Sequence, residues 1–235
     1  MTEHGSVHRG SADHHHHPSI DDTVAFLNTI ELESDALVDH LETFDDAARW
    51  LAEHRVVHGS GSDLRKATSD PGAALGRLRS VRAALREVAH AVADRRPADP
   101  AALAEVNRAI EGRERVELVP EPDGVSIGHS HVGDPLDDAL ARLADPIVEE
   151  IQSGREDRLR ICDNETCRWI FYDESRAGRR RWCDMASCGN RAKARRHRER
   201  VKSAAAATAA AARSASAANA SAPAARKAGN ATPAS

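Results

Sequence analysis

The clearest pattern in the chain is the recurrence of apolar residues at steps of three and four between residues 70 and 152. This spacing places them on one face of an α-helix. Four Asp-Pro pairs divide the region, and each suits a helix start, because Asp accepts a bond from a free backbone amide and Pro has no amide to leave unpaired. We therefore expect amphipathic helices to begin at Asp70-Pro71, Asp99-Pro100, Asp134-Pro135 and Asp145-Pro146.

Shorter patterns precede these helices. In VAFLNTI, which begins at Val24, the apolar residues fit one helix face, although Phe26 also fits a short strand. Thr43 followed three residues later by Asp46 predicts a capped helix start. The glycine- and serine-rich run HGSGSD, residues 58–63, predicts a loop.

One segment within the helical region has the period of a β-hairpin. In RVELVPEPDGVSIGHS, Val116 and Leu118 alternate with polar residues before a PEPDG turn, and Val125 and Ile127 alternate after it. The predicted fold class is therefore mostly α with a small β-hairpin, in which the narrow apolar stripes of the helices bury against each other.

The composition of the two ends differs from that of the middle. Residues 1–18 form a His-rich head that reads as disordered; His14–His17 could hold a metal loosely, but such a run is more often a solvated tail. Residues 203–235 are rich in Ala and Ser and also read as disordered, with the first alanines extending a preceding helix. Between them we expect a helical domain over residues 19–154 and a small second domain over residues 155–202.

Composition and charge narrow the class of protein. No apolar stretch approaches the roughly 20 residues that span a bilayer, and the N-terminus lacks the apolar core of a signal peptide, so we expect a cytoplasmic protein with no membrane partner. Residues 1–154 hold 15 Lys and Arg against 29 Asp and Glu, whereas residues 155–202 hold 15 against 8. An acidic body thus carries a basic end that suits a polyanion.

The four cysteines of the chain lie in this basic end, spaced C-x4-C-x15-C-x4-C. Two close pairs can wrap four thiolates around one tetrahedral Zn²⁺, whereas two disulfides would require an oxidising compartment, and four inert thiols would not be expected to fall into matched pairs. With four cysteine ligands the metal has no open position, so one structural zinc per chain is expected. The predicted ligands are Cys162, Cys167, Cys183 and Cys188.

The insert between the two pairs is long enough for a hairpin. Trp169-Ile170-Phe171-Tyr172 is the strongest strand pattern in the chain, ESRAGRRR reads as a turn, and Trp182 leads into the second pair. We therefore expect a zinc-ribbon or knuckle-like finger with a core separate from that of the helices.

The sequence from Arg160 to Arg200 resembles the CGNR zinc finger, named for its Cys188-Gly189-Asn190-Arg191 signature. The upstream stretches FLNT (residues 26–29), RLRSVRAALREV and LAEVN resemble the ABATE domain that precedes this finger in bacterial proteins. The resemblance covers about residues 20–200. It implies a stress-linked bacterial transcription regulator.

The positive charges that follow the last cysteine predict a partner. GNRAKARRHRERVKS consists largely of good helix formers, and its cations surround nearly every face, so this helix cannot be stabilised by burial. An Arg-rich surface suits phosphates and guanine edges. The predicted nucleic-acid contacts are Arg179, Arg180 and Arg181 in the hairpin turn, and Arg191, Lys193, Arg195, Arg196, Arg198, Arg200 and Lys202 in the helix.

Two classes of function remain open at this point. The first is a DNA-binding regulator, with a helical domain that binds an unknown ligand or mediates assembly as a homodimer. The second is a protein-interaction module, in which the basic finger binds an acidic protein partner or RNA. An enzyme is not expected, because no nucleophile–base pair or open metal motif is present. The scattered histidines fit surface or paired roles; they are His40, His54, His58, His90, His129 and His131.

Overall fold

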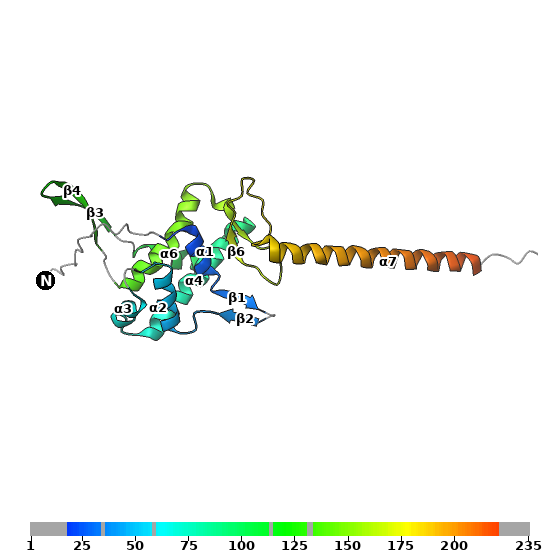
Figure 1. Ribbon diagram of the computed structural model, residues 1–235, viewed down its shortest axis with the longest axis horizontal. Coiled ribbons are helices and arrows are strands. Elements are labelled where there is room, and N and C mark those ends of the chain that lie inside the picture. Colours follow the sequence, from blue (N-terminus) through cyan, green and yellow to red (C-terminus); the bar gives the residue numbers. More distant parts are fainter. Residues whose placement is uncertain (1–17, 34–35, 58–59, 113–114, 131–133, 221–235) are drawn as a thin grey trace, which may run out of the picture. The chain divides into compact units, whose positions relative to one another are not determined.

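The structure is a computed structural model that describes residues 18–33, 36–57, 60–112, 115–130 and 134–220. Its elements in chain order are α1 (Ile20–Leu27), β1 (Ile30–Glu33), β2 (Ala36–Asp39), α2 (Phe44–Glu53), α3 (Gly61–Ala67), α4 (Pro71–Asp94), α5 (Pro100–Ile110), β3 (Arg115–Glu121), β4 (Gly124–Ser130), α6 (Pro135–Gln152), η1 (Glu156–Arg158), β5 (Leu159–Ile161), β6 (Ile170–Tyr172), η2 (Met185–Gly189) and α7 (Asn190–Ala220). The mostly helical fold class is confirmed (Figure 1). None of the helices in the described ranges is both long and apolar enough to cross a bilayer.

The chain divides into two compact units between Cys188 and Gly189. The first unit holds the helices α1–α6, the three small sheets and all four cysteines, and the second begins at Gly189 and contains α7.

Three of the four Asp-Pro helix starts are confirmed. The side chains of Asp70, Asp99 and Asp134 each accept a bond from a backbone amide in the first turn of α4, α5 and α6, at 2.8–2.9 Å. The Thr43 start is confirmed as well, because its hydroxyl accepts from the Asp46 amide while the Asp46 carboxylate accepts from the Thr43 amide. Such reciprocal caps satisfy amides that a helix otherwise leaves unpaired.

The fourth Asp-Pro prediction is wrong, because Pro146 lies inside α6. An interior proline costs a helix about 3 kcal/mol through one lost backbone bond and a steric clash. The helix continues because Leu143 and Ile147, before and after the proline, are both almost completely buried, and each such burial contributes about 1.5–3 kcal/mol.

The prediction of a loop over HGSGSD, residues 58–63, is also wrong for its second half, because α3 begins at Gly61. Ser60 and Asp63 form a capping box of the same kind as Thr43 and Asp46. Glycine is required at position 61 because an added Cβ would lie 2.6 Å from the carbonyl oxygen of Ala48.

Two hairpins differ in how well the sequence predicted them. The β3–β4 hairpin is confirmed, with Leu118 opposite Ile127 and a turn that ends at Gly124. The β1–β2 hairpin was not predicted; Ile30, which was expected on a helix face, begins β1 because α1 ends at Leu27. Phe26 belongs to α1 rather than to a strand and is fully buried.

The helices α1, α2, α4 and α6 enclose one hydrophobic core, whose largest buried side chains include Leu78, Leu85 and Leu140. Leu159 of β5 and Ile170 of β6 belong to the same core. The finger nevertheless has a small core of its own, as expected, in which Phe171 and Trp182 pack with the four cysteines. The strands β5 and β6, of three residues each, are too short to be stable alone, and they contribute Leu159 and Ile170 to the helical core and Phe171 to that of the finger.

Arginines of α4 hold the loop between α1 and β1. The guanidinium of Arg82 is 3% exposed and donates to both carboxylate oxygens of Asp39, at 2.8 and 2.6 Å, and to the hydroxyl of Thr29 at 2.8 Å. Arg86 donates to the carbonyl oxygen of Leu27. The RLRSVRAALREV stretch thus fixes the FLNT stretch.

The pairing of Asp39 with Arg82 should be important for stability. Replacing Asp39 by Ala leaves a buried guanidinium without its anion, which should lower the free energy of unfolding by about 3 kcal/mol in urea titrations followed by circular dichroism. As the matched control, Asp45→Ala removes a carboxylate that is 71% exposed beside Arg65 and should change stability little. Equal losses in the two variants would contradict the role of Asp39.

The effect of Asp39→Ala should also depend on pH. Burial raises the pKa of Asp39, but hydrogen bonds from Arg82 and the Leu41 amide outweigh it, so the pKa lies below its usual value. A folded pKa below the unfolded value adds stability above the unfolded pKa, and that stability is lost as the pH falls through the folded pKa. The difference between wild type and Asp39→Ala should therefore narrow below a pH of about 4.

The helix α7 runs to Ala220. The Ala/Ser composition predicted disorder after residue 202, but residues 203–220 are helical. The helix continues because Ala has the highest helix propensity and neither Gly nor Pro interrupts the run. The extension of the preceding helix by the first alanines is confirmed. The head to residue 17, with His14–His17, and residues 221–235 lie outside the described residues.

Candidate metal centre and basic helix

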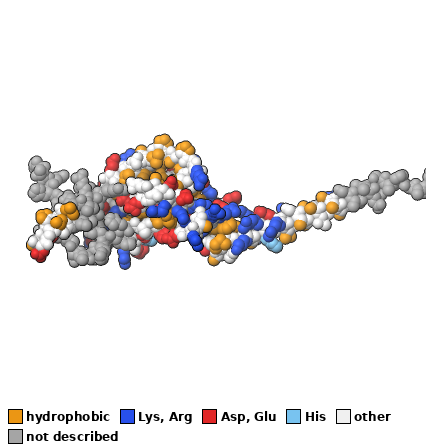
Figure 2. All heavy atoms as spheres, turned by 90° about the horizontal axis from the view of Figure 1, so that it is seen from above, with side chains coloured by type: hydrophobic (Ala, Val, Ile, Leu, Met, Phe, Trp, Pro, Cys, Tyr) orange, Lys and Arg blue, Asp and Glu red, His pale blue; other side chains and the backbone are white. Residues whose placement is uncertain are grey.

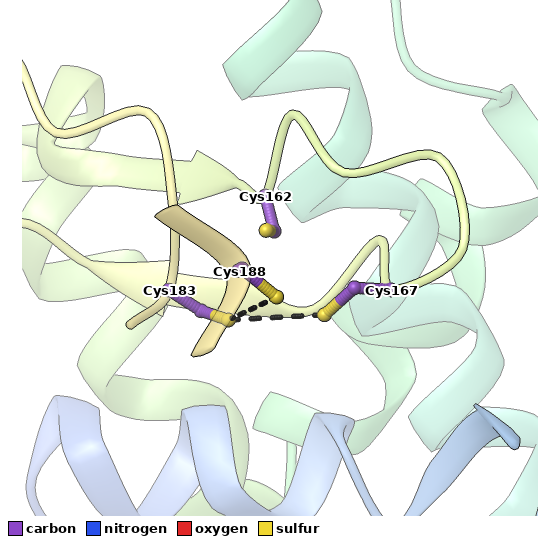
Figure 3. Close-up of side chains that lie close together, drawn as sticks. All are labelled: Cys162, Cys167, Cys183 and Cys188. Carbon is purple, nitrogen blue, oxygen red and sulfur yellow. Dashed lines mark hydrogen bonds between the residues drawn. The ribbon is translucent and has the colours of Figure 1, made fainter. Parts of the chain in front are cut away.

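The four cysteine side chains point toward one place from two segments of the chain (Figure 3). Cys162 directly follows β5 and Cys167 ends the turn after it, whereas Cys183 precedes η2 and Cys188 lies in it. All four Sγ atoms lie within 4.8 Å of one another. Cys162 and Cys188 are buried, and Cys167 and Cys183 are half-buried.

These distances fit a tetrahedral metal ion. Cys183 Sγ lies 3.7 Å from Cys167 Sγ and 3.8 Å from Cys188 Sγ. Four thiolates at about 2.3 Å from a zinc ion are separated by about 3.8 Å along each edge of the tetrahedron. A disulfide would need about 2.05 Å, and all four cysteines are free thiols. The arrangement favours a metal over the two-disulfide alternative.

Polar groups around the sulfurs shape both cysteine loops. In the first loop, the carbonyl oxygen of Asn164 accepts from the amides of Cys167 and Arg168, and its side-chain amide donates to Cys188 Sγ at 3.5 Å. In the second loop, the Asp184 carboxylate accepts from the amides two and three residues later, at 3.1 and 2.8 Å. Bonds of this kind orient metal ligands. Sequence reasoning missed both residues, although each lies one or two positions after the first cysteine of its pair.

The electrostatics of the cluster require a cation if the sulfurs are ionised. Burial raises the pKa of Cys167 to about 11, and burial followed by the neighbouring Cys167 raises that of Cys183 as well. Four adjacent thiolates would repel each other strongly in a partly buried site. A divalent ion removes this repulsion, and four sulfur ligands leave it no open position for a substrate.

Two family models match the chain. One, for the family called ABATE and described as "Putative stress-induced transcription regulator", matches residues 23–154. The other, for the CGNR zinc finger, matches residues 158–201 and covers all four cysteines. The chain is a member of the ABATE family with a CGNR zinc finger. No curated protein gives a significant match to it.

The β-structure of the CGNR finger differs from the predicted hairpin. The strand β6 pairs with β5, upstream of Cys162, and the described residues between Tyr172 and Cys183 form no strand. The Asn28 side chain of the ABATE helices fixes β6: its amide group donates to the Ile170 carbonyl at 2.7 Å, and its oxygen accepts from the Ile170 amide at 3.1 Å. The ABATE part and the finger are therefore joined by direct bonds.

Two of the three arginines in the predicted hairpin turn are bonded within the CGNR finger. Arg180 donates to the carbonyl oxygen of Cys183 at 2.5 Å and lies over the ring of Phe171. Arg181 pairs with Asp163 at 2.5 Å. Arg179 is exposed. A phosphate contact by Arg180 or Arg181 would compete with these bonds, which leaves Arg179 as the best placed of the three.

The cations of α7 form an exposed basic segment that begins three residues after Cys188. Lys and Arg side chains gather where α7 begins (Figure 2). Within the segment Glu199 is the only carboxylate, and it lies 3.9 Å from Arg195. Each of the seven cations is exposed: Arg191, Lys193, Arg195, Arg196, Arg198, Arg200 and Lys202.

Three histidines of the described residues contact neighbouring side chains or are partly buried, and they are His40, His54 and His90. His40 pairs with Glu31 at 2.7 Å, and His54 stacks on Trp50. Burial and the nearby Arg86 lower the pKa of His90, which favours its neutral form. His58 and His131 lie outside the described residues, and so does the side chain of His129.

Proposed function

We propose that this chain is a DNA-binding transcription regulator and not an enzyme. Its four cysteines hold one structural zinc ion, and its α7 helix contacts duplex DNA. The observation that carries the proposal is the exposed basic segment of α7, which has seven cations and one carboxylate, in a chain that is otherwise acidic. The regulator family named by the ABATE model supports the same conclusion.

A bound zinc ion supplies a rigid cross-link between the two cysteine loops. The chain's own residues prepare this link: Asn164 orients Cys188, and Asp184 caps the turn that contains it. The segment η2 ends at Gly189, and α7 begins at the next residue. The cross-link therefore fixes the residues from which the basic helix starts.

The α7 helix has the charge that nucleic acid requires. Its cations cannot be buried in a protein core, and like charges at neighbouring positions destabilise a helix in isolation. Duplex DNA offers one phosphate per about 1.7 Å of its axis, so binding relieves this repulsion and releases counterions.

The helical part supplies what one small finger lacks. A single small module buries little surface on DNA, so specific binding needs a second contact. We propose that the ABATE helices mediate assembly, as in a homodimer, or bind a small ligand. The alternative is that the basic segment binds an acidic protein or RNA.

Fluorescence anisotropy of labelled duplex DNA with the full-length chain tests the proposal. If four of the cations contact phosphates, affinity should fall by about 100-fold between about 50 and 200 mM salt. An equally charged polyglutamate serves as the comparison. Binding to polyglutamate without binding to duplex DNA would replace the proposal with the acidic-partner alternative.

A further inference from the structure

The basic segment of α7 is organised in two opposite rows. An α-helix turns by about 100° per residue, so residues at steps of three and four share a face. On this spacing four cations form one row and three form another, about 160° away around the helix. The rows are Arg191, Arg195, Arg198 and Lys202 on one side, and Lys193, Arg196 and Arg200 on the other.

A stripe without formal charge lies between the rows, and we name it the recognition stripe. It consists of Asn190, Ala194, His197 and Val201, all exposed, at positions i, i+4, i+7 and i+11. The opposite stripe between the rows contains Glu199, the only carboxylate of the segment.

This arrangement matches the major groove of B-form DNA. The groove is about 12 Å wide, and a helix with its side chains is about 10–12 Å across. A helix in the groove has a phosphate backbone on each side, base edges beneath it and solvent above it. The two rows supply a cation for each backbone, and Glu199 on the opposite stripe then faces solvent, away from the bases.

We propose that α7 lies in the major groove of duplex DNA with the recognition stripe against the base edges, at a site that contains A·T base pairs. This inference rests on the proposed function. The chemistry of the stripe fits adenine and thymine: an asparagine amide pairs with the adenine edge, and the methyl groups of Ala194 and Val201 suit the thymine methyl group.

The same features disfavour RNA as the partner. The major groove of A-form RNA is too deep and narrow to be read by side chains, and proteins bind single strands largely by stacking bases on aromatic rings. Residues 190–202 contain no Phe, Tyr or Trp, and His197 is their one ring that could stack on a base.

Two matched variants of the full-length, zinc-loaded chain test the placement. Val201→Glu puts a carboxylate on the recognition stripe, and Ser203→Glu puts the same charge two residues away on the solvent stripe. Both positions are exposed, and both variants lower the net charge by one. Circular dichroism should show equal helix content in the two variants.

Each protein is mixed with a pool of DNA duplexes of randomised sequence, and the bound fraction is sequenced. This measurement shows which base sequences each protein prefers. We expect wild type and Ser203→Glu to enrich the same motif with A·T base pairs, and Val201→Glu to lose that motif and bind about 10-fold more weakly.

Each of the other possible outcomes would refute one stated part of the proposal. If the two variants had equal effects, or if the wild type enriched no motif, the role of the recognition stripe would be refuted. The proposed function would still stand as long as the wild type bound duplex DNA in a salt-dependent way. Equally tight binding of wild type to an RNA duplex would overturn the groove placement. If the wild type bound no duplex at all, the proposed function would fail with it.

Discussion

Replacing Cys183 by Ser is expected to abolish zinc binding and to unfold the second cysteine loop while the helices stay folded. Structural zinc sites in finger peptides bind with about 10–16 kcal/mol, far more than the contacts of this loop can replace. The strands β5 and β6 should persist, because Leu159 and Ile170 belong to the helical core. Metal analysis should give one zinc per wild-type chain and none in the variant.

Hydrogen exchange locates the unfolded residues. In Cys183→Ser, amides from residue 176 to residue 189 should exchange rapidly, whereas the Ile170 amide, bonded to Asn28, should stay protected. Met185→Ala, at an exposed position of the same loop, is the control and should keep both the metal and the protection. A serine variant that retained a full equivalent of zinc, or wild-type protein with two disulfides, would refute the four-cysteine site.

Replacing Arg195, Arg196 and Arg198 by Ala is expected to weaken DNA binding mainly at low salt. Each phosphate contact contributes about −0.9 to the slope of log K against log salt, so the slope should flatten by about 2–3 if all three contact phosphates. Zinc content should not change, because these residues lie beyond the ligands.

The control variant must carry the same loss of charge. Arg49, Arg65 and Arg108 are exposed arginines in surface ion pairs of the helical part, and their replacement by Ala also removes three charges. That variant should keep the wild-type slope. If the two triple variants behaved alike, binding would reflect only net charge, and the assignment of the contacts to α7 would be lost.

Local signals in the sequence predicted local structure well. The aspartates before Pro71, Pro100 and Pro135 cap helices because capping depends on residues within one turn. Pro146 has the same local sequence, but long-range burial on both sides of it decides the outcome. The four-cysteine cluster was predictable because its spacing is itself the signal.

What the sequence could not supply was the partner of each side chain. The strand at Ile170 was recognisable, but its pairing with β5 and its bonds to Asn28, 142 residues away, follow from tertiary packing. Arg180 and Arg181 resemble Arg179 in the sequence, yet only the fold shows that they are bonded within the finger. From the sequence alone, each of these arginines would be expected on the surface, because most Arg side chains in folded proteins are exposed.

We expect the bonds between Asn28 and Ile170 to couple zinc binding to helix stability, because Cys162 and Cys167 lie between β5 and the strand β6 that these bonds hold. A ligand that binds only the folded chain stabilises it by about 4 kcal/mol at a thousand-fold excess over its Kd. Because such coupling is reciprocal, a molecule that tightens the packing of the helices against β6 raises the affinity for zinc by the same factor by which zinc raises the affinity for that molecule. Withdrawal of the metal should therefore lower the melting temperature of helices that contain no cysteine.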